Sequence, residues 1–298
     1  MAKKKNESKK TATQPTQYPS LPNVLQLTKT TTHMLWSNKA VLGGIALIYG
    51  LLSIVLVQGL AATTDVVSVK QQLNQVFTGN LGSVASSFSV FMILVGSAGS
   101  GSSQSAGVYQ FFLGLIASLA IIWALRQLYS NVTIRIRDAY YRGMTPLVPF
   151  VLVLLMVGLQ LLPMLIGSSI YSTVISNGIA VTAIEKLLWL ALFLGLTAVS
   201  LYFISSSVIA LYIATLPDMT PLKALRSAKE LVKNRRWLVI RKLLFLPVAL
   251  LVVAAVIMLP VIAIIPIIAP CLFFVLTMLA LVVIHTYIYT LYRELIRE

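Results

Sequence analysis

Three polar side chains, two amides and one imidazole, lie inside the long apolar runs of this sequence. They are the residues of these runs whose side chains could take part in binding or proton transfer. They are Gln58, Gln160 and His285. An imidazole in a membrane segment can contact a lipid headgroup or pass a proton, and two amides can line a polar pocket. The two amides fall near the outer ends of their segments, where they could face one another. A structural role is open to each as well, because an amide can bond a neighbouring helix and a histidine can stand among interfacial tyrosines.

No pattern typical of a catalytic or metal site occurs around these residues. The apolar runs contain no Asp, Glu, Lys or Arg, which argues against a carrier built on a membrane carboxylate and against an intramembrane metalloenzyme. The sequence holds no Gly-rich phosphate loop, Gly-x-Ser-x-Gly or Cys-x-x-Cys motif. The single cysteine, Cys271, excludes an intrachain disulfide. We therefore predict no catalytic residue, no cofactor and no metal, and a protein that is not an enzyme.

Positive charge is concentrated in residues 218–242, where eight Lys and Arg lie between two apolar runs. Thr220 and Pro221 provide a hydroxyl N-cap and a proline at the first helical position, which is a helix start. Apolar side chains recur on one side of this helix and basic ones on the other, a pattern typical of a helix that lies on a membrane surface. The apolar side is formed by Leu222, Leu225, Ala228 and Val232. The basic side chains that we expect to contact anionic lipid are Lys223, Arg226, Lys229, Lys233, Arg235 and Arg236.

The composition places these segments in a membrane protein. The chain of 298 residues is 58% hydrophobic and only 10% charged, whereas soluble domains carry about 25% charged residues. Its apolar runs are long enough to cross about 30 Å of hydrocarbon. We predict an all-α integral membrane protein with six transmembrane helices, at about residues 40–61, 108–125, 147–170, 187–214, 243–265 and 271–292.

The orientation follows from the distribution of Lys and Arg, which resist translocation and gather on the cytoplasmic side. Six spans leave all 23 Lys and Arg except Lys70 and Lys186 on the side of the two termini. We therefore predict a cytoplasmic-membrane protein with both termini in the cytoplasm. The same preference explains the net charge of +15, so we expect no nucleic-acid partner.

The remaining segments complete the predicted organisation. Residues 1–22 are polar and basic, which indicates a disordered cytoplasmic tail before a membrane domain of residues 23–298. Residues 23–39 resemble the helix after Thr220, and we expect a second short cytoplasmic amphipathic helix there. Residues 62–106 form a long outer loop with a Gly/Ser-rich part at residues 96–107 and a short apolar piece at residues 88–95.

A motif around residues 212–237 resembles a group of bacterial six-span proteins. It comprises Tyr212, Pro217 and Asp218, followed by Ala224, Leu225, Ser227, Leu231, Val232, Lys233, Asn234, Arg235, Arg236 and Trp237. The group includes the membrane domain attached to some glycerophosphoryl diester phosphodiesterases and related stand-alone proteins of unknown function. The resemblance covers about residues 23–292 and implies a fold and a cell-envelope setting. The phosphodiesterase's His and acidic cluster has no counterpart in these residues, so the resemblance carries over no catalytic residue.

Two functions follow as hypotheses. The first is a non-enzymatic membrane protein that assists lipid or envelope processes or scaffolds a membrane partner. Its expected partners are lipids of the anionic inner leaflet, with a second copy of the chain or another membrane protein as further candidates. The alternative is a transporter or permease for a small or lipid-like solute, which would need a polar cavity at mid-membrane.

Overall fold

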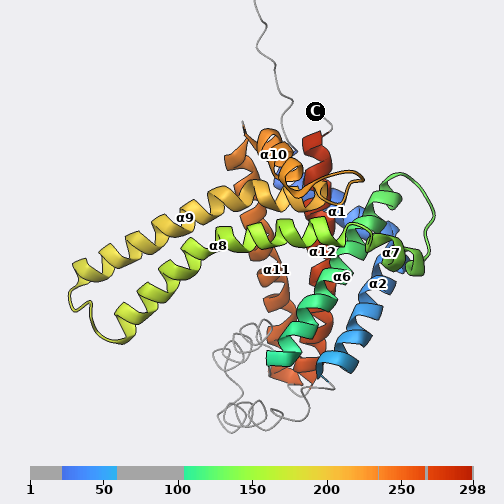
Figure 1. Ribbon diagram of the computed structural model, residues 1–298. Helices are drawn as coiled ribbons and strands as arrows, with labels where there is room; N and C mark the ends of the chain where they lie inside the picture. Colours follow the sequence, from blue (N-terminus) through green and yellow to red (C-terminus); the bar gives the residue numbers. More distant parts are fainter. Residues whose placement is uncertain (1–21, 59–103, 234, 266–267, 297–298) are drawn as a thin grey trace, which may run out of the picture.

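The described part of the protein is entirely helical. The computed structural model describes residues 22–58, 104–233, 235–265 and 268–296, and no strand occurs in these ranges (Figure 1). The helices are α1 Val24–Ser37, α2 Lys39–Leu52, α6 Gln104–Tyr129, α7 Ile136–Gly143, α8 Leu147–Ser176, α9 Ala183–Ile213, α10 Pro221–Val232, α11 Arg236–Ile264 and α12 Ala269–Ile296, and a π-helical segment, Ser53–Gln58, continues α2.

Six of these segments are long and apolar enough to cross a membrane, which confirms the predicted six-span, all-helical fold class. They are Lys39–Val57, Gly107–Tyr129, Leu147–Ser176, Ala183–Ile213, Arg236–Ile264 and Ala269–Ile296. The chain is a multi-pass membrane protein by the length and composition of these helices. The predicted tail at residues 1–22, except its last residue, and the part of the outer loop at residues 62–103 lie outside the described residues.

The helices extend beyond the predicted spans at several ends, because a helix does not have to stop where the hydrocarbon stops. The fifth span was expected to begin at residue 243, whereas α11 begins at Arg236 and includes Arg241 and Lys242 in its first two turns. Lys242 is only 4% exposed.

Helices α2, α6, α11 and α12 run side by side and form the bundle drawn upright in Figure 1. The most deeply buried side chains of α6 lie where it packs against its neighbours. They are Leu119, Ala120, Ile121, Ile122, Ala124 and Leu125, none more than 1% exposed. Helix α7 packs against the same helix, and its Gly143 lies directly on the α6 backbone. The Tyr140 hydroxyl of α7 donates to the Ile45 carbonyl of α2 at 2.9 Å, and burial, with a smaller effect of Tyr49, raises the pKa of this phenol to about 12.

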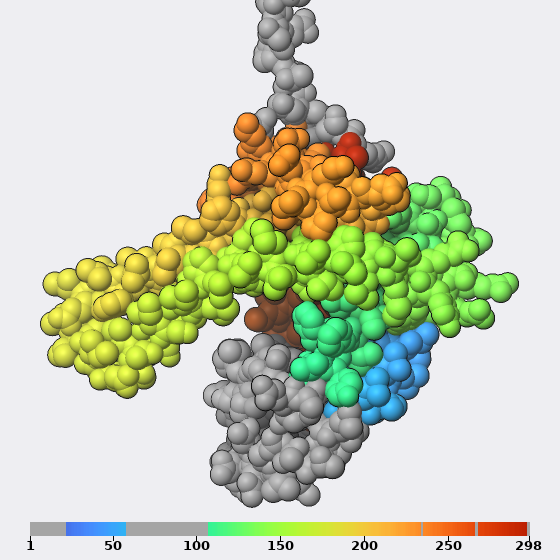
Figure 2. Space-filling model, viewed as in Figure 1, coloured from blue at the N-terminus to red at the C-terminus, as the bar shows by residue number. Residues whose placement is uncertain are grey.

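Helices α8 and α9 form an antiparallel hairpin that runs crosswise to the bundle and projects beyond it (Figures 1 and 2). The two helices approach closely at Gly167, where an added Cβ would lie 3.0 Å from Leu196, and Tyr171 stacks on Phe193. We call the projecting part, residues 158–200, the arm. Apolar side chains remain exposed along it, among them Leu159, Leu162, Leu165, Leu188 and Leu194. A helix that is apolar all round needs hydrocarbon or protein around it, so the arm belongs in the bilayer.

Positive charge gathers at the end of the bundle that carries α1, α7, α10 and the end of α12, which we call the basic end (Figure 1). All Lys and Arg of the described residues except Lys186 lie in or beside these elements or the first turns of α2 and α11. Helix α10 begins as predicted, with the Thr220 side chain accepting a bond from the Lys223 N–H.

The apolar stripes of the two short helices face protein. In α10 the buried side chains are Ala224, Ala228 and Val232, while Leu222, expected on the same side, is 72% exposed. In α1 the buried residues are Leu27 and Thr31, and α1 packs on α12. Both helices are therefore held by the bundle as well as by their amphipathic character.

We predict that Gly143→Ala destabilises the protein, because the new Cβ would lie 3.0 Å from the Ala120 Cα and 3.1 Å from the Leu119 carbonyl oxygen. Backbone atoms cannot rotate away, so α7 must shift, at a cost of about 1–3 kcal/mol. Thermal unfolding of the purified protein in detergent measures this. Gly195→Ala is the matched control, since nothing lies within 4 Å of its added Cβ, and equal unfolding temperatures for the two variants would show that this contact is not tight.

Candidate functional site

A cavity of about 270 Å³ lies where α8, α9, α10 and α11 meet, and we call it the Gln160 cavity. Each of the four helices contributes to its wall. The lining residues are Gln160 of α8, Tyr202, Phe203, Ser206 and Ser207 of α9, Leu225 and Lys229 of α10, and Arg236 of α11. The cavity thus joins the base of the arm to the basic end.

Two of the predicted lipid contacts line this cavity. The guanidinium carbon of Arg236 lies 4.3 Å from the centroid of the Tyr202 ring, a cation–π contact that holds the charge in place. Lys229 is exposed on the last turn of α10. The four other predicted contacts, Lys223, Arg226, Lys233 and Arg235, lie on or just after α10 but do not line the cavity. The six predicted lipid contacts therefore form two groups, one that lines the cavity and one that lies outside it.

Gln160 carries a buried acceptor in the wall of this cavity. Its Oε1 atom is buried and has no hydrogen-bond partner among the described residues. A buried polar atom without a partner costs about 1–3 kcal/mol, so it calls for a donor from water or a ligand. The hydroxyls of Ser206 and Ser207 do not supply one, because both donate to the Phe203 carbonyl, at 3.1 and 3.3 Å.

The position of Gln160 differs from the sequence-based expectation. We expected it near the outer end of its span, opposite Gln58. Because α8 runs crosswise to the bundle, the middle of this helix instead lies beside α10 and α11. The side chain of Gln58, at the end of the π-helical segment, lies outside the described part of the chain.

His285 contacts different residues from Gln160. Its Nδ1 lies 2.9 Å from the Tyr212 hydroxyl, and its Nε2 lies 2.9 Å from Oγ of Ser118. The Ser118 hydroxyl donates its proton to the Gly114 carbonyl at 2.7 Å. Nε2 must therefore be the donor to Ser118, and Nδ1 accepts from Tyr212, which describes a neutral imidazole. This chain of bonds ties α6, α9 and α12 together.

The tyrosines near His285 form a buried aromatic cluster, whereas the sequence favours an interfacial position for Tyr287 and Tyr289, which are 2% and 6% exposed. Tyr212 lies 6.1 Å from Tyr289 and 6.3 Å from Tyr292 between ring centroids. These three rings are at most 6% exposed. Their spacing on α12 could have suggested packing, because positions 285, 289 and 292 recur at three and four residues and so share one helix face. The sequence did not indicate this packing, because tyrosine and histidine are also typical of a membrane interface.

Sequence reasoning also missed contacts that join distant segments. The residues next to Tyr202 in the sequence do not indicate that its ring contacts Arg236. Arg126 reaches the end of α9, where it donates to the Thr215 carbonyl at 2.9 Å and also to the Thr215 hydroxyl. Such pairs are 34 and 89 residues apart, and only the folded arrangement shows them.

No family model, no curated protein and no solved structure matches this chain. The resemblance to the membrane domain of glycerophosphoryl diester phosphodiesterases therefore stays a prediction. The evidence for the fold is the set of six long apolar helices, and the evidence for the candidate site is the arrangement of its residues.

We predict that Tyr212→Phe lowers the stability by about 1–3 kcal/mol, because it leaves a buried imidazole nitrogen without its donor. Thermal unfolding in detergent measures the loss. Tyr109→Phe is the control, since Tyr109 is 46% exposed on α6. Equal unfolding temperatures for the two variants would mean that the bond to His285 contributes nothing.

Proposed function

We propose that this multi-pass protein is a non-catalytic lipid-binding protein of the cytoplasmic membrane, with both termini in the cytoplasm. In this proposal the Gln160 cavity holds the headgroup of an anionic lipid. Binding of such a lipid would let the protein assist lipid or envelope processes or scaffold a membrane partner. The observation that carries the proposal is the unpartnered Gln160 acceptor in the same cavity as Lys229 and Arg236.

The cavity fits the chemistry of an anionic headgroup that also carries hydroxyls. A phosphodiester can accept charge-assisted hydrogen bonds from Lys229 and Arg236. A headgroup hydroxyl can donate to Oε1 of Gln160, a buried acceptor without a partner among the described residues. Phosphatidylglycerol has both features. The apolar side chains of the adjoining arm offer a surface to its acyl chains.

The distribution of charge supports the same orientation and partner. The cytoplasmic leaflet carries anionic lipid, and each Lys or Arg near it contributes about 1 kcal/mol of attraction. The basic end gathers nearly all the described cations and includes the cavity. A lipid drawn to this end by the general charge would therefore meet the cavity.

The transporter alternative receives less support. It would need a polar cavity at mid-membrane, and the Gln160 cavity reaches α10, at the basic end. In the bundle, Leu119, Ile121 and Ile122 of α6 are fully packed. Where α6, α9 and α12 meet, the hydrogen-bonded chain through His285 holds the helices together.

We predict that the double variant Lys229→Gln/Arg236→Gln loses co-purifying phosphatidylglycerol, with a fall in affinity of about tenfold or more, because each lost charge-assisted bond is worth about 1.5–3 kcal/mol. Lipid retained per protein after detergent extraction, measured by mass spectrometry, reports this. The matched control is Lys223→Gln/Arg226→Gln, which removes the same charge from α10 outside the cavity. Equal losses in the two variants would point to general surface attraction and would remove the headgroup site.

Gln160→Leu tests the acceptor separately. We expect unchanged or higher stability, because the variant removes a buried oxygen without a partner. We also expect a weaker preference for phosphatidylglycerol over phosphatidic acid, whose headgroup has no glycerol hydroxyl to donate. Competition between the two lipids for the purified protein measures the preference, and an unchanged ratio would contradict this role of Gln160.

Site-directed labelling tests the orientation. In a Cys271→Ser background, Lys223→Cys should react with an impermeant maleimide only after the cells are permeabilised, because α10 is proposed to face the cytoplasm. Lys70→Cys, in the predicted outer loop, should react in intact cells. Labelling of position 223 from outside intact cells would reverse the topology.

A further inference from the structure

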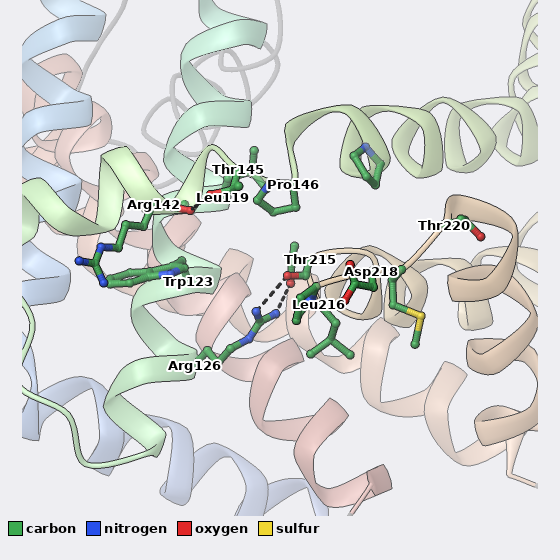
Figure 3. A pocket seen from close by; sticks show the side chains of 14 residues that line it. Leu119, Trp123, Arg126, Arg142, Thr145, Pro146, Thr215, Leu216, Asp218 and Thr220 are labelled. Atoms are coloured by element: carbon green, nitrogen blue, oxygen red, sulfur yellow. Dashed lines mark hydrogen bonds between the residues drawn. The ribbon is translucent and has the colours of Figure 1, made fainter.

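A second and larger cavity lies at the basic end, and the proposed lipid site does not use it. Its volume is about 700 Å³, within the range of small-molecule sites. It opens between α6, the turn that leads into α8, and the segment of residues 215–220 that leads into α10 (Figure 3). We call it the Arg126 pocket. Its apolar wall is formed by Leu119, Trp123, Pro146, Pro149, Leu216 and Met219.

Arg126 provides a fixed positive charge in this pocket. Its guanidinium donates to the carbonyl and to the hydroxyl of Thr215, which is itself buried. Both bonds join the end of α6 to the end of α9. Since the protein already holds the guanidinium in place, a ligand does not have to order it, and preorganisation of this kind favours binding.

A second guanidinium group lines the pocket, and it comes from α7. Arg142, on the last turn of α7, is exposed. Figure 3 shows its guanidinium end beside the Trp123 ring, on the side of the pocket away from Asp218. The two guanidinium groups therefore occupy different parts of the pocket, with the Trp123 side chain beside that of Arg142. A guanidinium group suits phosphate, because it matches the phosphate oxygens in geometry and charge.

Asp218 adds a negative charge, which distinguishes this pocket from the Gln160 cavity. It is the only acidic residue among those that line the pocket. Its backbone has a φ of 60°, in the left-handed region, which Asp and Asn tolerate better than other side chains. In Figure 3 Arg126 lies between Asp218 and Arg142. The pocket therefore carries both signs of charge, with the cations in excess.

We propose that the Arg126 pocket binds a phosphate ester that also carries a primary amine, as in a phosphoethanolamine group. The phosphate is held by Arg126, which Figure 3 places between Asp218 and Arg142, and the ammonium group is held by Asp218. Arg142, at the far side of the pocket, adds positive charge that attracts the anion. A ligand that is only anionic would bring its charge against Asp218, and one that is only cationic would face two arginines. Asp218 is exposed, so a ligand can reach its carboxylate from solvent, and the apolar wall around Trp123 offers a surface to the carbon atoms of the ligand.

Two sources offer this chemistry, the headgroup of phosphatidylethanolamine and free phosphoethanolamine. The test titrates the purified full-length protein in detergent with phosphatidylethanolamine, phosphatidylglycerol or phosphatidylcholine and follows binding by native mass spectrometry. Soluble phosphoethanolamine is then added as competitor. Arg142→Gln and Asp218→Asn are the pocket variants, and Asn suits the left-handed backbone at position 218. Arg135→Gln and Glu230→Gln are charge-matched controls that do not line the pocket.

We expect the wild-type protein to prefer phosphatidylethanolamine over the other two lipids. Arg142→Gln should weaken its binding by about threefold, because it removes one exposed charge that attracts the phosphate. Asp218→Asn should weaken phosphatidylethanolamine by a similar factor while leaving phosphatidylglycerol unchanged or tighter, and both controls should stay within about twofold of wild type. Displacement by millimolar phosphoethanolamine would support the headgroup chemistry with the free compound as source. Resistance to displacement would support it with the lipid as source.

Two results would overturn the proposal. In the first, phosphatidylethanolamine binds both pocket variants as it binds the wild type. In the second, Asp218→Asn weakens all three lipids alike, so that the acid does not recognise an amine. Because the Lys229→Gln/Arg236→Gln variant leaves this pocket intact, the two proposed sites can fail independently.

Discussion

The cost of placing a guanidinium or ammonium group in hydrocarbon decides how this protein is arranged. Among the described residues, Lys and Arg occupy the short helices and helix ends at one end of the bundle, and Lys186 is the exception at the tip of the arm. Charged side chains are costly in hydrocarbon, so they lie at the ends of the long helices and beside them, and Lys and Arg gather preferentially on one side. The end of α7 and the segment before α10 line one pocket, and α10 lines the other, so both cavities lie where cations and apolar walls meet.

Within the bundle, polar groups are present but nearly all of them serve packing. The chain from Tyr212 through His285 to Ser118 satisfies three polar side chains with one another and with a helix carbonyl. In hydrocarbon no water replaces a missing partner, so such bonds fix the relative register of α6, α9 and α12. Gln160 stands apart, because its acceptor has no partner in the described part of the chain. That contrast is the reason for treating Gln160 as part of a site and His285 as part of the core.

The sequence predicted what depends on composition and local pattern. The six long helices, the start of α10 at Thr220 and Pro221, and the gathering of cations all follow from apolar length, capping and charge. It did not predict what depends on the angle between helices. Because α8 runs crosswise, Gln160 lies near the basic end and not at the predicted outer end. The helices approach one another closely at Gly143 and Gly167. At Gly195, by contrast, nothing lies within 4 Å of an added Cβ. Likewise, no pattern in the sequence indicates that Arg126 contacts Thr215.

The crosswise arm has a consequence for the bilayer itself. With α2, α6, α11 and α12 upright, the apolar helices α8 and α9 lie at a large angle to them. Helices of 30 and 31 residues are longer than the hydrocarbon requires, and a tilted span accommodates the excess length. Lipids beside the tilted pair have to adapt their thickness to it, so the shape of the protein alone would favour some chain lengths around it, whatever its two cavities hold.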